Sequence, residues 1–191
     1  NLLMAATLDG IQIASVPPGF DPSVLGKRIT QIAAERKADP WDVLFQLLIA
    51  GEGRIGALYH MMSEDDVVTG LKYDRVTIGT DSSALRTEGI LSRGAPHPRS
   101  YGTFPRVLGK YVRDDKVLTL HGAVAKMTGT AAAQIGLRDR GLLRADQFAD
   151  LVVFDPQTIK DNATYEQPHR SEEHTSELQS RQYLVCRLLL E

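Results

Sequence analysis

The chain has 191 residues, of which 42% are hydrophobic and 24% charged, a composition typical of one globular domain or of part of a larger one. Lysine plus arginine number 22 and aspartate plus glutamate 24, so the sequence lacks the basic excess of nucleic-acid-binding proteins. No apolar run reaches membrane-spanning length, and the start has no signal-peptide pattern. We expect no nucleic-acid or membrane partner and a cytoplasmic location, with the true N-terminus upstream of Asn1.

The first elements are predicted to be a strand and two helices. Residues 11–16 (IQIASV) are short, β-branched and followed by two prolines, which predicts a strand and a turn. Helical spacing of apolar residues predicts a helix over residues 25–36. Asp39 and Pro40 then supply an N-cap and a first-turn proline for a second helix. The buried stripe of that helix is predicted to comprise Trp41, Leu44, Phe45 and Leu48.

Two more strands are predicted before the middle of the chain. Residues 54–61 form one, a short helix follows from residue 63, and residues 75–80 (RVTIGT) form the next. The last of these strands leads directly into Asp81, which begins a polar cluster. Because strands alternate with helices here, the sequence predicts βα units and a parallel sheet.

The second half begins with a long loop. Residues 82–100 have no periodicity and contain scattered glycine and proline, and loops of this length are often functional. Helices are predicted over residues 102–113, 119–129 and 131–134. Residues 149–155 (ADLVVFD) form a nearly continuous apolar run, which predicts a buried strand.

A set of motifs in this region carries a family resemblance. They are HPRSYGTFPRVLGKYVR (97–113), KMTG (126–129), GLRDRGLL (136–143), ADLVVFDP (149–156) and ATYEQPH (163–169), preceded in the same order by MSEDDV (62–67) and IGTD (78–81). Together they resemble the N-acyl-D-amino-acid deacylases of the amidohydrolase superfamily, over residues 11–169. Two turns depart from the family pattern, where Ser82 and the Ala145–Asp146 pair replace glycine.

The resemblance implies an α/β fold in two parts. Residues 1–135 would be the C-terminal part of a (β/α)8 metallo-dependent hydrolase barrel, and residues 136–169 part of a small β-sandwich domain. The first barrel strands, with the family's histidine and cysteine metal ligands, would lie upstream of this chain. Zinc is therefore implied as the cofactor and a small molecule as the substrate. Within this segment only Asp81 is a possible metal contact.

The implied reaction is hydrolysis of a non-peptide C–N bond, most specifically deacylation of an N-acyl-D-amino acid. Such a reaction needs a nucleophilic water, which a bound zinc ion can supply, and a carboxylate that moves a proton to the departing nitrogen. Asp81 follows a strand, where barrel enzymes place catalytic groups, and the resemblance assigns it the role of general base. An aspartate that only forms the turn after a strand is the alternative.

Other candidates surround the long loop. His97 and Arg99 could bind the substrate, whose carboxylate suits an arginine, or they could be solvated loop residues. Arg106 is a third substrate-binding candidate, with a structural role as its alternative. His60, near a strand end, is expected to be a core histidine rather than a metal ligand.

Two further hypotheses keep the same fold. One changes the substrate to a cyclic amide, as in hydantoinases and dihydroorotases, although the GTFPRVLG block favours the acyclic deacylases. The other is a barrel relative that lost its metal and only binds or assembles. The upstream ligands would decide between the catalytic and non-catalytic hypotheses.

The last part of the sequence has a different origin from the rest in our interpretation. Residues 170–180 (RSEEHTSELQS) resemble the in-frame translation of a sequencing-library adapter, so we expect the natural frame to end near His169 and residues 170–191 to be foreign. Cys186, the only cysteine, and His174 then carry no redox or metal role. We also expect the chain by itself to expose strand edges, to aggregate and to be inactive.

Overall fold

The computed structural model describes residues 6–170, which form two compact units. Within the described residues, unit 1 comprises residues 6–63, 82–100 and 163–169, and unit 2 comprises residues 64–81, 101–162 and 170. The segments 82–100 and 163–169 therefore pack with the N-terminal part of the chain, although they are distant from it in sequence. The expected foreign tail lies outside the described residues, except for Arg170.

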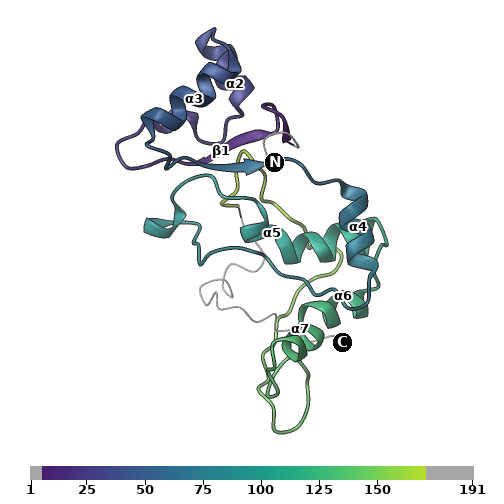
Figure 1. Ribbon diagram of the computed structural model, residues 1–191. Coiled ribbons are helices and arrows are strands. Elements are labelled where there is room, and N and C mark those ends of the chain that lie inside the picture. The colour runs from purple at the N-terminus through teal and green to yellow at the C-terminus, as the bar shows by residue number, and fades with distance from the viewer. Residues whose placement is uncertain (1–5, 171–191) are drawn as a thin grey trace. The chain divides into compact units, whose positions relative to one another are not determined.

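Unit 1 contains a two-stranded antiparallel sheet and two helices. Its elements are β1 (Ile11–Ser15), the 3-10 helix η1 (Pro22–Val24), α2 (Ile29–Arg36), α3 (Pro40–Ala50), β2 (Gly56–Tyr59) and the 3-10 helix η2 (Gly89–Ser92). The strands pair with Ile11 opposite Tyr59 and Ile13 opposite Ala57. Helices α2 and α3 lie beside each other next to this sheet (Figure 1).

The antiparallel pairing corrects the prediction of parallel βα units in this part of the chain. Strand β1 has β2 on one edge, while on its other edge Gln12 makes an isolated bridge with Arg28 and the Ile13 amide donates to the Lys27 carbonyl at 2.9 Å. Both edges of β1 are thus occupied by local partners. Apolar and β-branched runs predict that a strand forms, but they do not encode its direction or its neighbour.

The caps of α3 follow the sequence prediction, but its buried face does not. The Asp39 carboxylate accepts a hydrogen bond from the Trp41 amide at 2.8 Å, and Pro40 begins the helix. Its buried residues are Val43 and Leu47, with Leu44 partly buried. The predicted stripe is wrong at three positions, because the side chains of Trp41, Phe45 and Leu48 are exposed.

The core of unit 1 surrounds strand β1 and helix α2. Ile11 and Ile13 lie on β1 and are 2% exposed, Ile29 and Ile32 on α2 are at most 1% exposed, and Val43 from α3 is fully buried. Burial of such side chains stabilises a fold by about 1.5–3 kcal/mol each. This cluster gives unit 1 a small hydrophobic core that does not depend on unit 2.

Unit 2 is built from helices and extended segments. Its helices are α4 (Glu64–Lys72), α5 (Arg99–Arg106), which begins in unit 1, the π-helix η3 (Val107–Asp114), α6 (Leu120–Met127) and α7 (Gly129–Gln134). Pro105 in α5 has no amide hydrogen to donate, and the wider π-turns begin two residues later. The Thr119 hydroxyl caps α6 by accepting from the Gly122 amide at 3.0 Å, as the sequence predicts.

Two predicted strands of unit 2 have no strand partner among residues 6–170. Residue 75 ends a turn, and residues 76–80 and 149–155 have no regular secondary structure and no ladder hydrogen bonds. Val153, predicted to be buried, is 71% exposed. A strand needs a neighbouring backbone to pair with, and the described residues provide none at these positions. The parallel sheet and the buried strand are therefore absent from the part of the chain that the structure describes.

No helix within residues 6–170 has the length and apolar character needed to span a membrane.

Candidate active site

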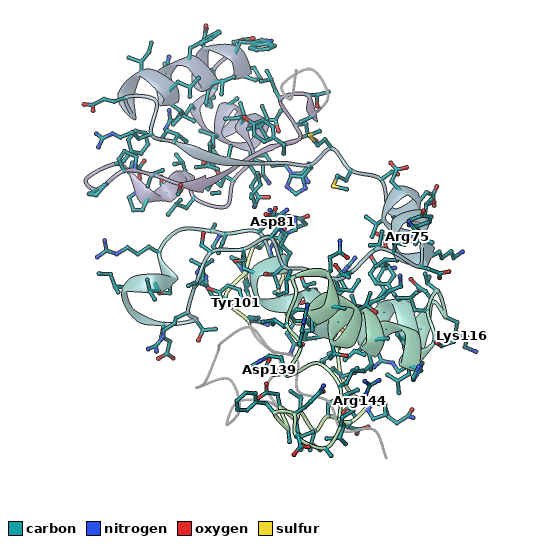
Figure 2. All side chains as sticks on the ribbon, turned by 60° about the horizontal axis from the view of Figure 1, so that its bottom comes forward. Arg75, Asp81, Tyr101, Lys116, Asp139 and Arg144 are labelled. Atoms are coloured by element: carbon teal, nitrogen blue, oxygen red, sulfur yellow. The ribbon has the colours of Figure 1, made fainter. Side chains whose placement is uncertain are left out.

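Asp81 ends the extended segment that follows α4. Its backbone φ is +47°, in the left-handed region that aspartate tolerates better than most residues but still populates at a cost in energy. The residue is exposed. Figure 2 labels Arg75 and Asp81, which mark the two ends of this segment. Five other non-glycine residues among those described, including Asp146, also have positive φ, so the conformation by itself does not single out Asp81.

His97 lies just before α5 and contacts Tyr165, 68 residues further along the chain. Its Nδ1 atom accepts a hydrogen bond from the Arg99 amide at 3.0 Å. The neutral ring then carries its proton on Nε2, which lies 3.1 Å from the Tyr165 hydroxyl and donates to it. The loop prediction for residues 82–100 holds for most of its length, but His97 is a fixed, half-buried residue rather than a solvated one.

His60 contacts the same tyrosine ring. The centroids of the His60 and Tyr165 rings are 4.4 Å apart, and those of His97 and Tyr165 are 5.1 Å apart. The Nε2 atom of His60 lies 2.8 Å from the Gln12 side-chain carbonyl. Because the Gln12 amide nitrogen already donates to the Gly26 and Tyr165 carbonyls, its oxygen accepts and His60 donates. His60 is thus hydrogen-bonded, as the prediction of a satisfied core histidine requires, but it is half-buried rather than part of the core.

Burial lowers the pKa of His60 below its ordinary value of 6.5, and the positive charge of Arg28 acts in the same direction. The lowered pKa favours the neutral histidine at pH 7, and its Nε2–H still donates to Gln12. Gln12 is only 3% exposed, and its side-chain amide is fully hydrogen-bonded. The nitrogen donates to two backbone carbonyls, and the oxygen accepts from His60. We call the set Gln12, His60, His97 and Tyr165 the histidine–tyrosine cluster.

Arg99 is the first residue of α5, and its side chain is exposed. The hydrogen bond from its amide to His97 fixes the backbone from which the guanidinium extends. The structure thus brings His97 and Arg99 together in unit 1. Asp81 and Arg106 belong to unit 2.

Arg106 takes part in an ionic network in unit 2. Its guanidinium lies 4.0 Å from the Glu64 carboxylate and 3.9 Å from that of Asp161. Tyr111 donates a hydrogen bond of 2.8 Å to Glu64, and Lys110 lies 3.3 Å from the same carboxylate. We call these five residues the ionic network. Its contacts agree with the structural alternative for Arg106.

The charges of the ionic network reinforce one another. The hydrogen bond from Tyr111 and the nearby Lys110 hold the pKa of Glu64 below its ordinary value of 4.5, against a smaller opposing effect of burial. Burial opposes the charge on Arg106, but the contacts with Tyr111, Glu64 and Asp161 outweigh it and raise the pKa of the guanidinium. Both groups are therefore charged at neutral pH.

Within residues 6–170 no group of three or more histidine, cysteine, aspartate or glutamate side chains is arranged to hold a metal ion. The described residues alone therefore do not fit a zinc site. A small apolar cavity of about 180 Å³ in unit 2 is lined by residues that include Leu108, Leu120 and Ile159. None of the four predicted site residues lines this cavity.

Several residues that make buried or half-buried polar contacts, including Lys126 of α6, were not singled out individually by the sequence. Tyr165 lies in the ATYEQPH motif and Lys126 in KMTG, so the motifs marked the right segments without indicating their contacts. Gln12 gave no signal beyond being a polar residue in an apolar strand. Its partners, Gly26, His60 and Tyr165, come from three separate segments of the chain.

The sequence matches the amidohydrolase family over residues 74–182, a range that continues past His169 into the expected tail. D-aminoacylase of Alcaligenes xylosoxydans xylosoxydans is 46% identical over 147 residues, which cover 77% of this chain and 28% of that protein. The chain therefore spans less than a third of that relative's length.

Two solved structures are also similar. One is N-acyl-D-glutamate deacylase from Bordetella bronchiseptica, complexed with zinc and a phosphonate inhibitor that mimics the tetrahedral intermediate. It matches with a TM-score of 0.73 and 35% identity, over 90% of this chain and 33% of that one. The other is a D-aminoacylase with a binuclear metal centre, with a TM-score of 0.68 and 42% identity, over 84% of this chain and 31% of that one.

Proposed function

Because the chain belongs to the amidohydrolase family and resembles its N-acyl-D-amino-acid deacylases, we propose that the full-length protein hydrolyses the acyl amide of N-acyl-D-amino acids. The similarity to D-aminoacylase and to N-acyl-D-glutamate deacylase supports this substrate class. The protein would be a hydrolase that acts on a small molecule at a C–N bond other than a peptide bond.

Asp81 is the proposed general base, and its position directly after residues 75–80 and before the long loop is the observation that carries the proposal. The residue combines a left-handed φ of +47° with a position at the end of an extended segment, immediately before the long loop.

In the proposed reaction, the oxygen of a water molecule forms a bond to the amide carbonyl carbon. The Asp81 carboxylate takes a proton from that water and gives it to the amide nitrogen as the C–N bond breaks. The products are the carboxylic acid of the acyl group and the free D-amino acid, and the proton of that acid passes to the amine, which leaves a carboxylate and an ammonium group. Asp81 ends the cycle in its starting form, so no other reactant is needed.

Zinc is the proposed cofactor of the full-length protein, by analogy with the zinc complex of the similar deacylase. A bound zinc ion lowers the pKa of water and so supplies a nucleophile near neutral pH. Its main ligands would come from parts of the protein outside this chain, since residues 6–170 contain no metal cluster. Asp81 is the residue of this chain that we propose could contact the metal.

Arg99 and His97 are proposed to act at the substrate's carboxylate. Arg99 is exposed at the start of α5, and a guanidinium binds a carboxylate through two parallel hydrogen bonds. His97 would hold the Arg99 backbone through its Nδ1 atom. Arg106 remains the weaker candidate, since it already contacts Glu64 and Asp161.

In fold terms, we propose that residues 1–135 belong to the C-terminal part of a (β/α)8 barrel and residues 136–169 to a small β-sandwich domain. The similarity to solved deacylase structures supports the assignment. The extended segments 75–80 and 149–155 would then pair with strands from the rest of the protein.

The test compares two aspartates with the same backbone conformation. In the full-length protein loaded with zinc, Asp81→Asn keeps a side chain that tolerates positive φ but removes the base. We expect kcat to fall by about 10²- to 10⁴-fold. Asp146, with φ of +63°, is the control, and Asp146→Asn should retain activity. Equal activity of Asp81→Asn and the wild type would overturn the role of Asp81.

The substrate panel separates the other hypotheses. N-acyl-D-amino acids, their L-enantiomers, a hydantoin and dihydroorotate are assayed with the wild type. Hydrolysis of only the cyclic substrates would move the protein to the cyclic amidohydrolases. No hydrolysis by metal-loaded protein, together with no upstream histidine ligands in the recovered gene, would support a non-catalytic barrel relative.

A further inference from the structure

Lys126 is a buried lysine near the end of α6. It is 7% exposed, and a buried ammonium group is unfavourable unless it is hydrogen-bonded. Its Nζ atom donates to the Tyr73 carbonyl at 2.6 Å and to the Val76 carbonyl at 3.0 Å. Both acceptors belong to the backbone that leads from α4 toward Asp81.

The position of the ammonium suits the end of a helix. Helix α4 ends at Lys72, so the Tyr73 carbonyl lies at its C-terminus, where the helix dipole is negative. A lysine can cap such an end by donating to the last carbonyls. The Tyr73 carbonyl also accepts from the Val76 amide at 3.1 Å, which closes a turn.

The backbone of Lys126 adds a third attachment. Its carbonyl accepts a hydrogen bond from the Ile78 amide at 3.2 Å. Lys126 is therefore hydrogen-bonded to the backbone at three positions, Tyr73, Val76 and Ile78. Since this segment has no strand partner within residues 6–170, the contacts with Lys126 replace part of the hydrogen bonding that a sheet would supply.

We propose that Lys126 is a positioning residue that fixes residues 73–78 and thereby sets the placement of Asp81. Asp81 lies three residues beyond Ile78, so at most about 11 Å of chain separates it from the last attachment. The inference rests on the proposed role of Asp81 as general base. A catalytic group displaced by about 1 Å can lose about 10²-fold in rate.

The experiment uses the full-length zinc-loaded protein with Lys126→Met and Lys126→Arg. Methionine fills a similar volume without donors, whereas arginine keeps the charge and the donors. We expect kcat of Lys126→Met to fall about 10- to 100-fold with KM changed by less than about threefold, because substrate binding is not altered. Lys126→Arg should recover a substantial part of kcat.

Lys110→Met is the matched control. Lys110 lies in the same unit and pairs with Glu64 and Asp115 rather than with residues 73–78. We expect its kcat to equal that of the wild type. A similar loss of activity in both methionine variants would mean a general loss of stability and would overturn the proposal.

Amide hydrogen exchange supplies a readout that is independent of activity. Lys126→Met should expose the amides of residues 76–81 while protection of α6 is retained. If protection and kcat are both unchanged, the proposal is wrong even when Asp81→Asn is inactive. If the wild type hydrolyses none of the substrates, loss of protection still supports the attachment while the proposed function fails. If neither Lys126 variant folds, the residue serves the fold and the proposal is overturned.

Discussion

The two units hold their clustered polar side chains in different ways. In unit 1 the histidine–tyrosine cluster consists of uncharged side chains, and the Gln12 amide at its centre is hydrogen-bonded on both its nitrogen and its oxygen. In unit 2 the ionic network pairs the carboxylates of Glu64 and Asp161 directly with the cations of Arg106 and Lys110, and Tyr111 donates to Glu64. Lys126 is a separate buried cation with its own contacts. A neutral cluster responds chiefly to protonation of its histidines, whereas an ionic network also responds to salt.

The units also differ in how their extended segments are held. Strand β1 in unit 1 pairs with β2 and packs on its own core. Residues 75–80 in unit 2 are held by a helix side chain and its backbone. We therefore expect unit 1 to be the more robust unit and unit 2 to depend more strongly on contacts with the rest of the protein.

The largest effect concerns the chain by itself. Large apolar side chains are exposed in both units, including Ile49 at 78% in unit 1 and Val153 at 71% in unit 2. We expect residues 1–191 to associate in solution, because exposed apolar surface and unpaired segments promote aggregation. Size-exclusion chromatography with light scattering checks this. A soluble monomer with a cooperative unfolding transition would contradict the expectation.

A substitution in the core of unit 1 tests how much that core contributes to the stability of the unit. In the full-length protein, Ile32→Ala removes a side chain that is 1% exposed at the centre of unit 1. The free energy of unfolding of that region should fall by about 2–5 kcal/mol. Hydrogen exchange resolves which unit opens. The control, Ile49→Ala on the exposed face of α3, should change stability by less than about 0.5 kcal/mol.

Removing one hydroxyl from each unit tests the contrast between the neutral and the ionic cluster. Tyr111→Phe removes the donor to Glu64, and Tyr165→Phe removes the hydroxyl that accepts from His97. Each should lower local stability by about 1 kcal/mol. The Tyr111→Phe effect should shrink at high salt, because Glu64 is partly exposed and its interactions are screened. Equal salt dependence of the two variants would contradict the distinction.

The smallest effect is a pH response that differs between the units. The pKa of His60 is lowered in the folded state, so below pH 6.5 the unfolded chain binds the proton more readily and unit 1 loses stability. The pKa of Glu64 is also lowered, so unit 2 keeps the contribution of Glu64 until the pH falls below 4.5. Hydrogen exchange between pH 7 and pH 5 should show loosening near His60 first. His60→Gln should remove that response.

The sequence predicted the local features of the fold well, because helix starts depend on adjacent residues. Asp39 and Thr119 cap the helices they were expected to cap. The sequence did not predict contacts between segments that are distant along the chain. The direction of the β1–β2 pair and the absence of a partner for residues 75–80 depend on contacts that periodicity does not encode. Helix α3 is apolar on most sides, so its pattern could not distinguish the buried Val43 face from the exposed Trp41 face.

The same limit applies to the candidate site. The position of Asp81 directly after residues 75–80 could be predicted, since that segment is short and β-branched. The buried attachment through Lys126 could not, because Lys126 and Val76 are 50 residues apart in the sequence. The left-handed φ of Asp81 also had no signal in the residues around it. His97 and Tyr165 were each part of a recognised motif, but their contact was visible only in three dimensions.

The exposed face of α3 has a spectroscopic consequence. Trp41 is the only tryptophan in the sequence, it is 45% exposed, and it stacks on Phe45 with ring centroids 6.3 Å apart. Its fluorescence therefore reports on unit 1 alone, while circular dichroism averages over the helices of both units. When the two signals are followed through the same denaturation, separate midpoints would reveal independent opening of the units and coincident midpoints a single cooperative transition.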